Sequence, residues 1–113
     1  MEFTIRPARP DDLAAIATFT RDTFPWGDYV PDAFPRWLED EDLRVLVAAD
    51  AADTAVAVAH VGLLGPGEAW AGGMRVAPAV RRQGIAGRLV DEMLEWAAAR
   101  GARVGRLVVE EWN

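Results

Sequence analysis

The chain has 113 residues, enough for one compact domain, and 51% of them are hydrophobic, so it can bury a core. Its net charge of −6 argues against non-specific nucleic-acid binding, which needs a basic face, and we interpret the acidic surface as a source of solubility. The absence of cysteine excludes disulfides, thiolate metal sites and a cysteine nucleophile, and the single histidine excludes a multi-histidine metal site, so we expect no metal.

No apolar run approaches the ~18 residues that a membrane span needs. The amino-terminal residues lack the apolar core of a signal peptide. We therefore expect a cytoplasmic protein that does not contact a membrane.

Apolar periodicity and the positions of glycine and proline predict the elements of the chain. In order these are a strand over 3–6, a helix over 13–24, a short helix from 32, strands over 43–49, 55–64 and 68–76, a helix over 85–100 and a strand over 104–109. The order β-α-α-β-β-β-α-β indicates an α/β (α+β) fold with a mixed central sheet. The unit from 68 to 109 should be a right-handed parallel crossover.

Three details of these elements follow from particular residues. Asp11 and Asp12 supply the signals for the start of the first helix, and Asp32 can cap the second. The pair Gly72-Gly73 marks a bulge or a close backbone approach within its strand. The long helix should bury one face, formed by Leu89, Val90, Met93, Leu94 and Ala97.

The most specific feature is the loop Arg81-Arg82-Gln83-Gly84-Ile85-Ala86, which stands between a strand and a helix. Small residues at 84 and 86 let the backbone approach a ligand closely. The unpaired N–H groups of the first helical turn and the helix dipole form an anion site, to which two arginines add charge. The spacing differs from a P-loop and from a dinucleotide fingerprint. A pyrophosphate would suit this loop; the alternative is a glycine-rich loop that merely starts a helix.

The surroundings of the loop carry a family resemblance. The run Met74-Arg75-Val76-Ala77-Pro78, the loop over 81–86 and the amphipathic helix together resemble the central motif of the GNAT superfamily of acyltransferases. The order of elements and the pattern Leu107-x-Val109-x-x-x-Asn113 are similar to that family as well. The resemblance thus covers the whole chain.

The resemblance implies acetyl-CoA (coenzyme A) as the cofactor and a GNAT-type fold. The pantetheine arm would lie along the bulged fourth strand and the pyrophosphate on the loop, with an asparagine after the fifth strand also contacting the cofactor. The residues that match these positions are Met74, Arg75, Val76, Arg81, Arg82, Gln83, Gly84, Ile85, Ala86, Gly87 and Asn113. The reaction would be direct attack of a primary amine of a small molecule or amino acid on the thioester, with a base and an acid moving protons.

The proton-transfer groups are less defined. Glu68 is a candidate base because a region near the start of the fourth strand supplies one in some relatives, although Trp70 lies closer to the matching position. Glu110 and Glu111 are further candidates, and a solvated carboxylate is the alternative for each. His60 fits a packed or edge histidine better than a catalyst. The family's acid is often a tyrosine beyond the fifth strand, so we leave the acid unassigned.

The acceptor site should involve the segment between the first two helices. Trp26, Asp28 and Tyr29 are candidate substrate-binding residues, and an aromatic surface with a carboxylate would suit a small cationic amine. The run Asp28-Tyr29-Val30-Pro31 together with Trp70-x-Gly-Gly-Met-Arg-Val is similar to a GNAT subgroup that includes histidine N-acetyltransferases. We expect Phe24, Phe34 and Trp37 to belong to the core.

Family members usually continue past the fifth strand with a helix and two strands. We therefore expect a single GNAT-type domain over 1–113 that is short at its carboxyl end. Three alternatives stay open: an N-acetyltransferase, a non-catalytic or regulatory CoA-binding module, and a protomer completed by a partner chain, for instance as a homodimer.

Overall fold

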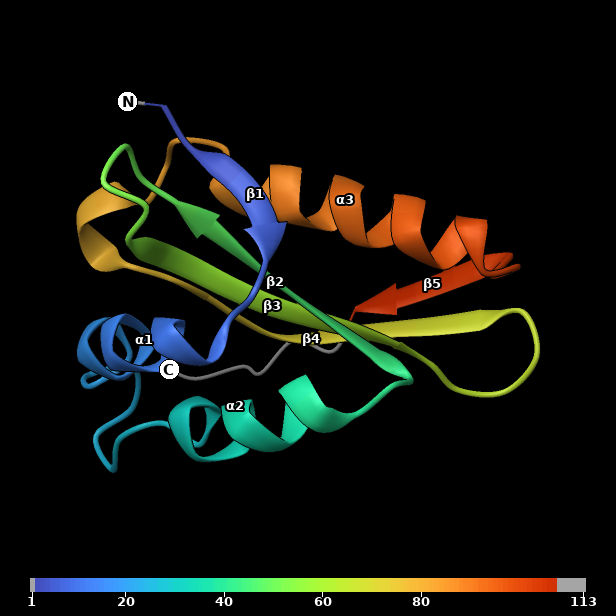
Figure 1. The fold of residues 1–113 in the computed structure, drawn as a ribbon, viewed down its shortest axis with the longest axis horizontal. Helices are drawn as coiled ribbons and strands as arrows, with labels where there is room; N and C mark the ends of the chain where they lie inside the picture. Colours follow the sequence, from blue (N-terminus) through green and yellow to red (C-terminus); the bar gives the residue numbers. More distant parts are fainter. Residues whose placement is uncertain (1, 108–113) are drawn as a thin grey trace.

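A five-stranded mixed sheet forms the centre of the structure, a computed structural model that describes residues 2–107 (Figure 1). The strands lie in the order β1-β2-β3-β4-β5, with bounds Thr4–Pro7, Leu43–Ala49, Ala55–Leu63, Glu68–Val76 and Val104–Leu107. The first four pair antiparallel, and β5 pairs parallel with β4. Parallel pairing requires a crossover connection, which confirms the predicted strand–helix–strand unit.

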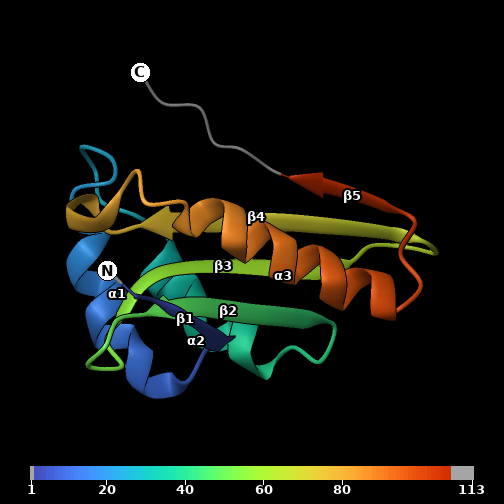
Figure 2. The same cartoon turned by 90° about the horizontal axis from the view of Figure 1, so that it is seen from above.

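Three α-helices cover the two faces of this sheet (Figure 2). On one face lie α1 (Leu13–Phe19) and α2 (Val30–Glu39), and on the other lies α3 (Ile85–Ala99). Short 3-10 turns, Pro10–Asp12 and Pro78–Val80, precede α1 and α3. The predicted α/β class and order of elements are confirmed.

The two cores follow from the period-two alternation of the strands. In β2, Val45 and Val47 point to the α1–α2 face, whereas Leu46 and Ala48 point to α3. All four side chains are buried. Because both faces are apolar, the central strands read as continuous hydrophobic runs, and their burial is the main stabilising contribution to the fold.

Three predicted details of the helices differ in the structure. The second helix begins at Val30, two residues before the predicted start, so Asp32 lies in its first turn and does not cap it. The first helix ends at Phe19 and does not reach Phe24, because the chain turns there: the Arg21 amide donates to the Thr18 carbonyl and the Thr23 amide to the Thr20 carbonyl. Leu94 was expected inside but is 49% exposed, while the other positions of that helix face are buried or half-buried.

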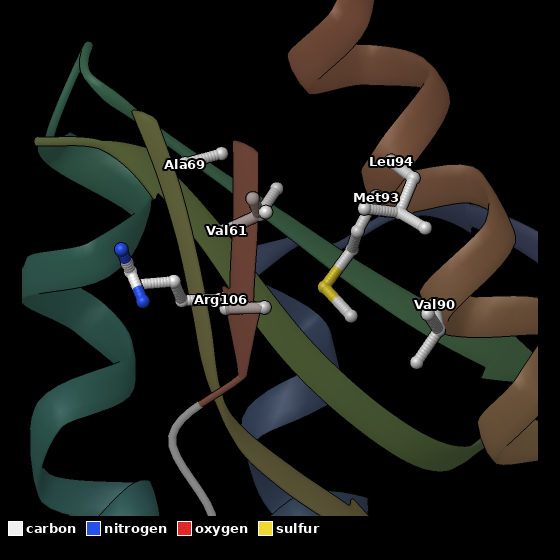
Figure 3. Close-up of a pocket in the computed structure, with 8 residues that line it drawn as sticks. Val61, Ala69, Val90, Met93, Leu94 and Arg106 are labelled. Carbon is white, nitrogen blue, oxygen red and sulfur yellow. The ribbon is translucent and has the colours of Figure 1, made fainter. Parts of the chain in front are cut away.

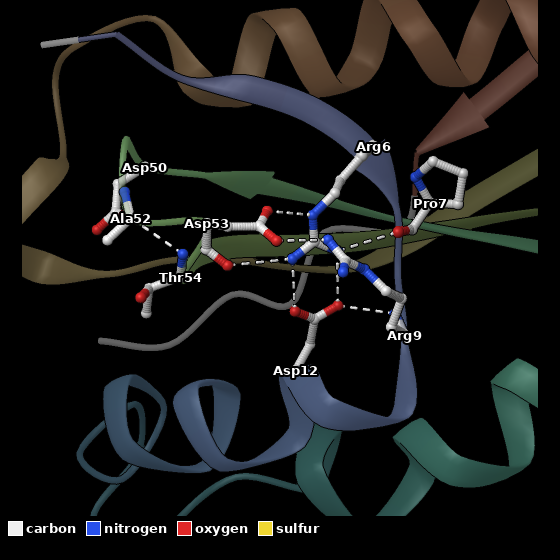
Figure 4. A network of polar contacts seen from close by, with 8 residues as sticks. All are labelled: Arg6, Pro7, Arg9, Asp12, Asp50, Ala52, Asp53 and Thr54. Carbon is white, nitrogen blue, oxygen red and sulfur yellow. Dashed lines mark hydrogen bonds and ion pairs between the residues drawn. The ribbon is translucent and has the colours of Figure 1, made fainter.

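A polar network ties β1 to the start of α1 and to the β2–β3 turn (Figure 4). The Arg6 guanidinium donates to both Asp12 oxygens, at 2.8 and 2.9 Å, and to Asp53 at 2.9 Å. Asp12 also accepts from the Arg9 amide at 2.7 Å, so its side chain closes the 3-10 turn. It makes no capping hydrogen bond to α1, contrary to the expectation from the sequence. Burial raises the pKa of Asp12, but these hydrogen bonds outweigh it and hold the pKa below its usual value.

None of the helices within residues 2–107 is both long and apolar enough to cross a membrane.

Candidate functional site

A bulge interrupts β4 where the sequence places its glycine pair. Val58 of β3 pairs with Arg75 and His60 pairs with Gly72, so Gly73 and Met74 face a single residue of β3. Gly73 has φ +62. A Cβ there would lie 2.7 Å from the Trp37 ring and 2.9 Å from the His60 ring. Only glycine fits this position, and the predicted bulge is confirmed.

The loop after β4 presents backbone amides at the start of α3. Arg82 and Gly84 both adopt left-handed conformations, with φ +68 and +78. Arg88 donates the first intrahelical bond, to the Gly84 carbonyl at 3.2 Å, so the amides of Ile85 and Ala86 precede any intrahelical acceptor. Turns of this kind form concave anion sites, and the positive end of the α3 dipole adds to the effect.

A cavity of about 430 Å³ joins this loop to the end of β4. Its lining combines the predicted pantetheine strand with the predicted pyrophosphate loop, namely Met74, Arg75, Val76, Val80, Arg81, Arg82, Gly84, Ile85 and Ala86. Arg81 Nε donates to the Val76 carbonyl at 3.2 Å and thereby ties the loop to the strand. An extended anionic molecule could thus contact strand and loop together.

On the α1–α2 face, an ion pair connects β4 to the segment between the helices. Arg75 Nε lies 2.6 Å from Asp28 Oδ2, and the side chains are 12% and 1% exposed. Asp28 Oδ1 also accepts from the Val30 amide at 3.0 Å. Burial raises the pKa of Asp28, but the hydrogen bonds from Arg75, Val30 and Thr23 outweigh it and lower the pKa. Both carboxylate oxygens are therefore engaged within the chain, and the contacts do not support a free carboxylate for a cationic acceptor.

Aromatic rings surround that ion pair. Phe24 and Trp26 stack at 5.2 Å between centroids, and Tyr29 meets Trp37 edge-on at 6.3 Å. We call Phe24, Trp26, Tyr29 and Trp37 the aromatic wall. Trp26 and Tyr29 are 72% and 44% exposed, so the wall offers apolar surface to solvent next to the β4 bulge.

His60 closes the series of rings at the sheet. Its ring lies 4.3 Å from that of Trp37, and its Nε2 lies 3.3 Å from where a Cβ of Gly73 would be. Nδ1 is buried without a hydrogen-bond partner in the described part of the chain. Burial lowers the pKa of His60 below its usual value, which favours the neutral imidazole.

A family model settles the classification. The model described as "Acetyltransferase (GNAT) family" matches residues 12–113. The chain belongs to the acetyltransferase (GNAT) family. By this membership the GNAT chain is an acyltransferase, and the family resemblance predicted from the sequence is confirmed.

Solved structures agree with the GNAT fold. A transcriptional regulator from Bacillus halodurans C-125 shares 25% identity at a TM-score of 0.82, covering 97% of this chain and 83% of that one. The aminoglycoside N-acetyltransferase AAC(6')-Iy was solved in complex with the bisubstrate analogue CoA-S-monomethyl-acetylneamine. It shares 19% sequence identity at a TM-score of 0.76, and the match covers 100% of this chain and 83% of that one. A predicted acetyltransferase from Clostridium acetobutylicum, solved with acetyl-CoA, shares 18% sequence identity at a TM-score of 0.74. That match covers 97% of this chain and 82% of the other. No curated protein matches the chain.

The GNAT chain brings together most of the predicted site residues, but not all. Glu68 lies at the opposite end of β4, where it pairs with Arg106 of β5 at 2.5 Å. At about 3.3 Å per residue, six residues place it roughly 20 Å from Met74 along the strand. Asn113, with Glu110 and Glu111, lies outside the described residues.

A second cavity, of about 150 Å³, lies between α3 and strands β3 to β5 (Figure 3). Its lining is apolar apart from one arginine: Val61, Ala69, Ala71, Val90, Met93, Leu94, Gly105 and Arg106. The small residues of β4 and β5 leave this space beneath Met93 and Leu94. It is separate from the loop cavity, since the two share no lining residue.

Sequence reasoning missed two features of the site. Arg75 was expected only as a residue of the cofactor strand, yet its side chain also forms the ion pair with Asp28. Phe24 and Trp37 were expected in the core, yet both are half-buried. Phe24 stacks on Trp26, and Trp37 packs between Tyr29 and His60. The glycine pair was the available signal, because a side-chain-free position at a bulge leaves room for neighbouring rings. Within residues 2–107, no group of three or more acidic or histidine side chains could hold a metal ion.

Proposed function

We propose that this GNAT chain is an N-acetyltransferase that moves the acetyl group of acetyl-CoA to a primary amine of a small molecule or amino acid. The observation that carries the proposal is the cavity in which the bulged end of β4 and the left-handed loop before α3 meet. Family membership supports the acyl donor, and two structures of similar fold hold CoA derivatives.

The residues present fit such a donor. The amides of Gly84, Ile85 and Ala86, at the amino end of α3, would hold the pyrophosphate, together with Arg81, Arg82, Gln83 and Gly87. The backbone of Met74, Arg75 and Val76 would pair with the pantetheine amides. The loop arginines supply a local positive charge in a chain of net charge −6. Acetyl-CoA, when bound, supplies the acetyl group and a thiolate leaving group.

The acceptor would enter from the α1–α2 face, along Trp26, Tyr29 and Trp37. The amine forms the new N–C bond, the C–S bond breaks, and the amine proton goes to a base of the chain or to water. Two candidates for that base lie within the described residues, Glu68 and His60. His60 is placed at the bulge, whereas Glu68 is paired with Arg106 at the far end of β4.

The acceptor itself is the finer part of the proposal. AAC(6')-Iy, which has a similar fold, holds a bisubstrate analogue that joins CoA to an acetylneamine, and this supports a small amine as the acceptor. With Asp28 neutralised by Arg75, recognition by aromatic rings fits the described contacts better than recognition by a free carboxylate. Membership of the histidine N-acetyltransferase-like subgroup, a cytoplasmic location and a homodimer stay predictions.

Thiol release tests the proposal. Acetyl-CoA and a panel of amines and amino acids are incubated with the chain, and free CoA is measured with a thiol reagent. We expect amine-dependent CoA release and an acetylated amine in the mass spectrum, without an acetylated enzyme, because attack is direct. CoA release that is independent of every amine, or no release at all, would contradict the proposal.

A further inference from the structure

Arg75 is the residue at which the two halves of the proposed site meet. Its backbone belongs to the bulged segment of β4, beside Met74, and lines the cavity that leads to the 81–86 loop. Its side chain extends to the other half, the segment between α1 and α2, where it reaches Asp28, 47 residues away in sequence.

The guanidinium makes contacts of two kinds. Nη1 donates to the Met74 carbonyl at 2.9 Å, which fixes the head group relative to the bulge. Nε and Nη2 donate to Asp28 Oδ2 and Oδ1, at 2.6 and 3.3 Å. This two-point contact with a carboxylate fixes orientation as well as distance. Lysine, with one ammonium, cannot reproduce it.

The other end of the ion pair organises the segment between the helices. Asp28 Oδ1 accepts from the Val30 amide, at the first residue of α2. The guanidinium carbon lies 5.6 Å from the ring centroid of Phe24 and 5.5 Å from that of Tyr29, so the cation supports two rings of the aromatic wall. The nearly buried ion pair of Arg75 and Asp28 thus fixes the position of the partly exposed aromatic wall.

Stability alone does not account for such a pair. Two charges that are almost removed from water gain little over an apolar pair of the same size, because desolvation offsets their attraction. What the pair adds is a fixed geometry between chain segments. Here it fixes residues 20–29 relative to the strand that would carry the pantetheine arm.

We propose that Arg75, through Asp28, is a positioning residue that sets the acceptor-binding geometry of the aromatic wall relative to the cofactor strand. This inference rests on the proposed function. Because one residue supplies both the cofactor-strand backbone and the tie to the wall, a change at its side chain disturbs acceptor binding while the backbone contacts to the cofactor stay in place.

The test uses Arg75→Lys, Asp28→Asn and the double variant Arg75→Lys/Asp28→Asn. Arg9→Gln is the matched control, because Arg9 also pairs with an aspartate, Asp53, at 2.7 Å but lies away from the site. For each protein, calorimetry gives the Kd of acetyl-CoA, and thiol release gives KM and kcat for the amine that the wild type acetylates fastest. Hydrogen exchange of residues 20–29 reports the segment directly and needs no amine.

Each single variant should raise the amine KM about tenfold or more, with acetyl-CoA Kd changed less than about threefold. Exchange in residues 20–29 should rise about tenfold while β2 and β3 stay protected. The double variant should be no worse than the poorer single variant, because both remove one interaction. Arg9→Gln should match the wild type.

Three outcomes would overturn the inference. Equal changes in amine KM and acetyl-CoA Kd would mean that the pair supports the whole site. Additive effects in the double variant, or unchanged exchange in residues 20–29, would mean that the pair does not hold the wall. If Arg75→Lys fails to fold, Asp28→Asn, which keeps the shape of the side chain, decides. A wild type that neither binds acetyl-CoA nor releases thiol would overturn the proposed function itself.

Discussion

Gly84 allows charge to be separated from shape in the proposed pyrophosphate site. Its φ is +78, a region that asparagine and aspartate enter more readily than other side chains. A Cβ at this position would meet no atom within 4 Å. Gly84→Asn and Gly84→Asp therefore add nearly the same volume with the same backbone cost, and they differ by one negative charge.

The expected difference follows from the position of residue 84 at the start of α3. A carboxylate there would lie on the order of 5 Å from a phosphate held by the helix amides, by the length of one side chain and one hydrogen bond. Two unit charges at that distance repel by about 1 kcal/mol at the dielectric constant of water and about 3 kcal/mol at an effective value near 20. Acetyl-CoA should thus bind Gly84→Asp about 5- to 150-fold more weakly than Gly84→Asn.

Calorimetric titration of both variants with acetyl-CoA measures this ratio, and thermal unfolding checks that both are folded. The ratio should shrink at high salt, because the site is open to solvent. Equal affinities in two folded variants would refute the argument, since a negative charge beside the pyrophosphate cannot be without effect.

Three further predictions concern the bulge, the network around Asp12 and the base. Gly73→Ala should lower the free energy of unfolding by about 2 kcal/mol, from left-handed strain and contact with two rings, whereas Gly87→Ala, which meets no atom within 4 Å in α3, should raise it slightly in the same urea titration. Asp12→Asn should cost about 2 kcal/mol at pH 7 by urea unfolding. Because the folded pKa of Asp12 is lowered, the wild-type advantage should be full above the ordinary pKa of an aspartate and vanish as the pH falls through the folded pKa, and a constant gap would contradict this assignment. If His60 is the base, His60→Gln should reduce kcat/KM about 100-fold near pH 7. It should also abolish the acid limb of the pH–kcat/KM profile, which in the wild type lies below pH 6.5, where the imidazole gains its proton. A larger loss in Glu68→Gln would instead make Glu68 the base.

Much of the fold could be predicted because local patterns and packing agree. The strand over 43–49 has the predicted bounds, since its apolar run is buried on both faces. The long helix starts at Ile85 as expected, where a glycine precedes an amphipathic pattern. The first helix was misjudged because periodicity continues past Phe19, while the tight turns over residues 18–23 end it.

The site divides in the same way. The loop over 81–86 could be found from sequence, because glycine spacing and a helix start are local signals. The ion pair between Arg75 and Asp28 could not, since it joins residues 47 positions apart and depends on how the segment after α1 folds back over β4. Glu68 was a candidate base because of its position on the fourth strand. The sequence did not show that this carboxylate pairs with Arg106 of the neighbouring strand.

The loop before α3 and the bulged end of β4 should together hold acetyl-CoA. Amide chemical shifts of the isotope-labelled chain, followed during titration with acetyl-CoA, test it most directly, because they report binding and its location at once. If both segments hold the cofactor, the shifts should be saturable and largest at residues 74–76 and 82–87. An absence of shifts, or shifts centred on the apolar cavity beside Met93 and Leu94, would contradict it.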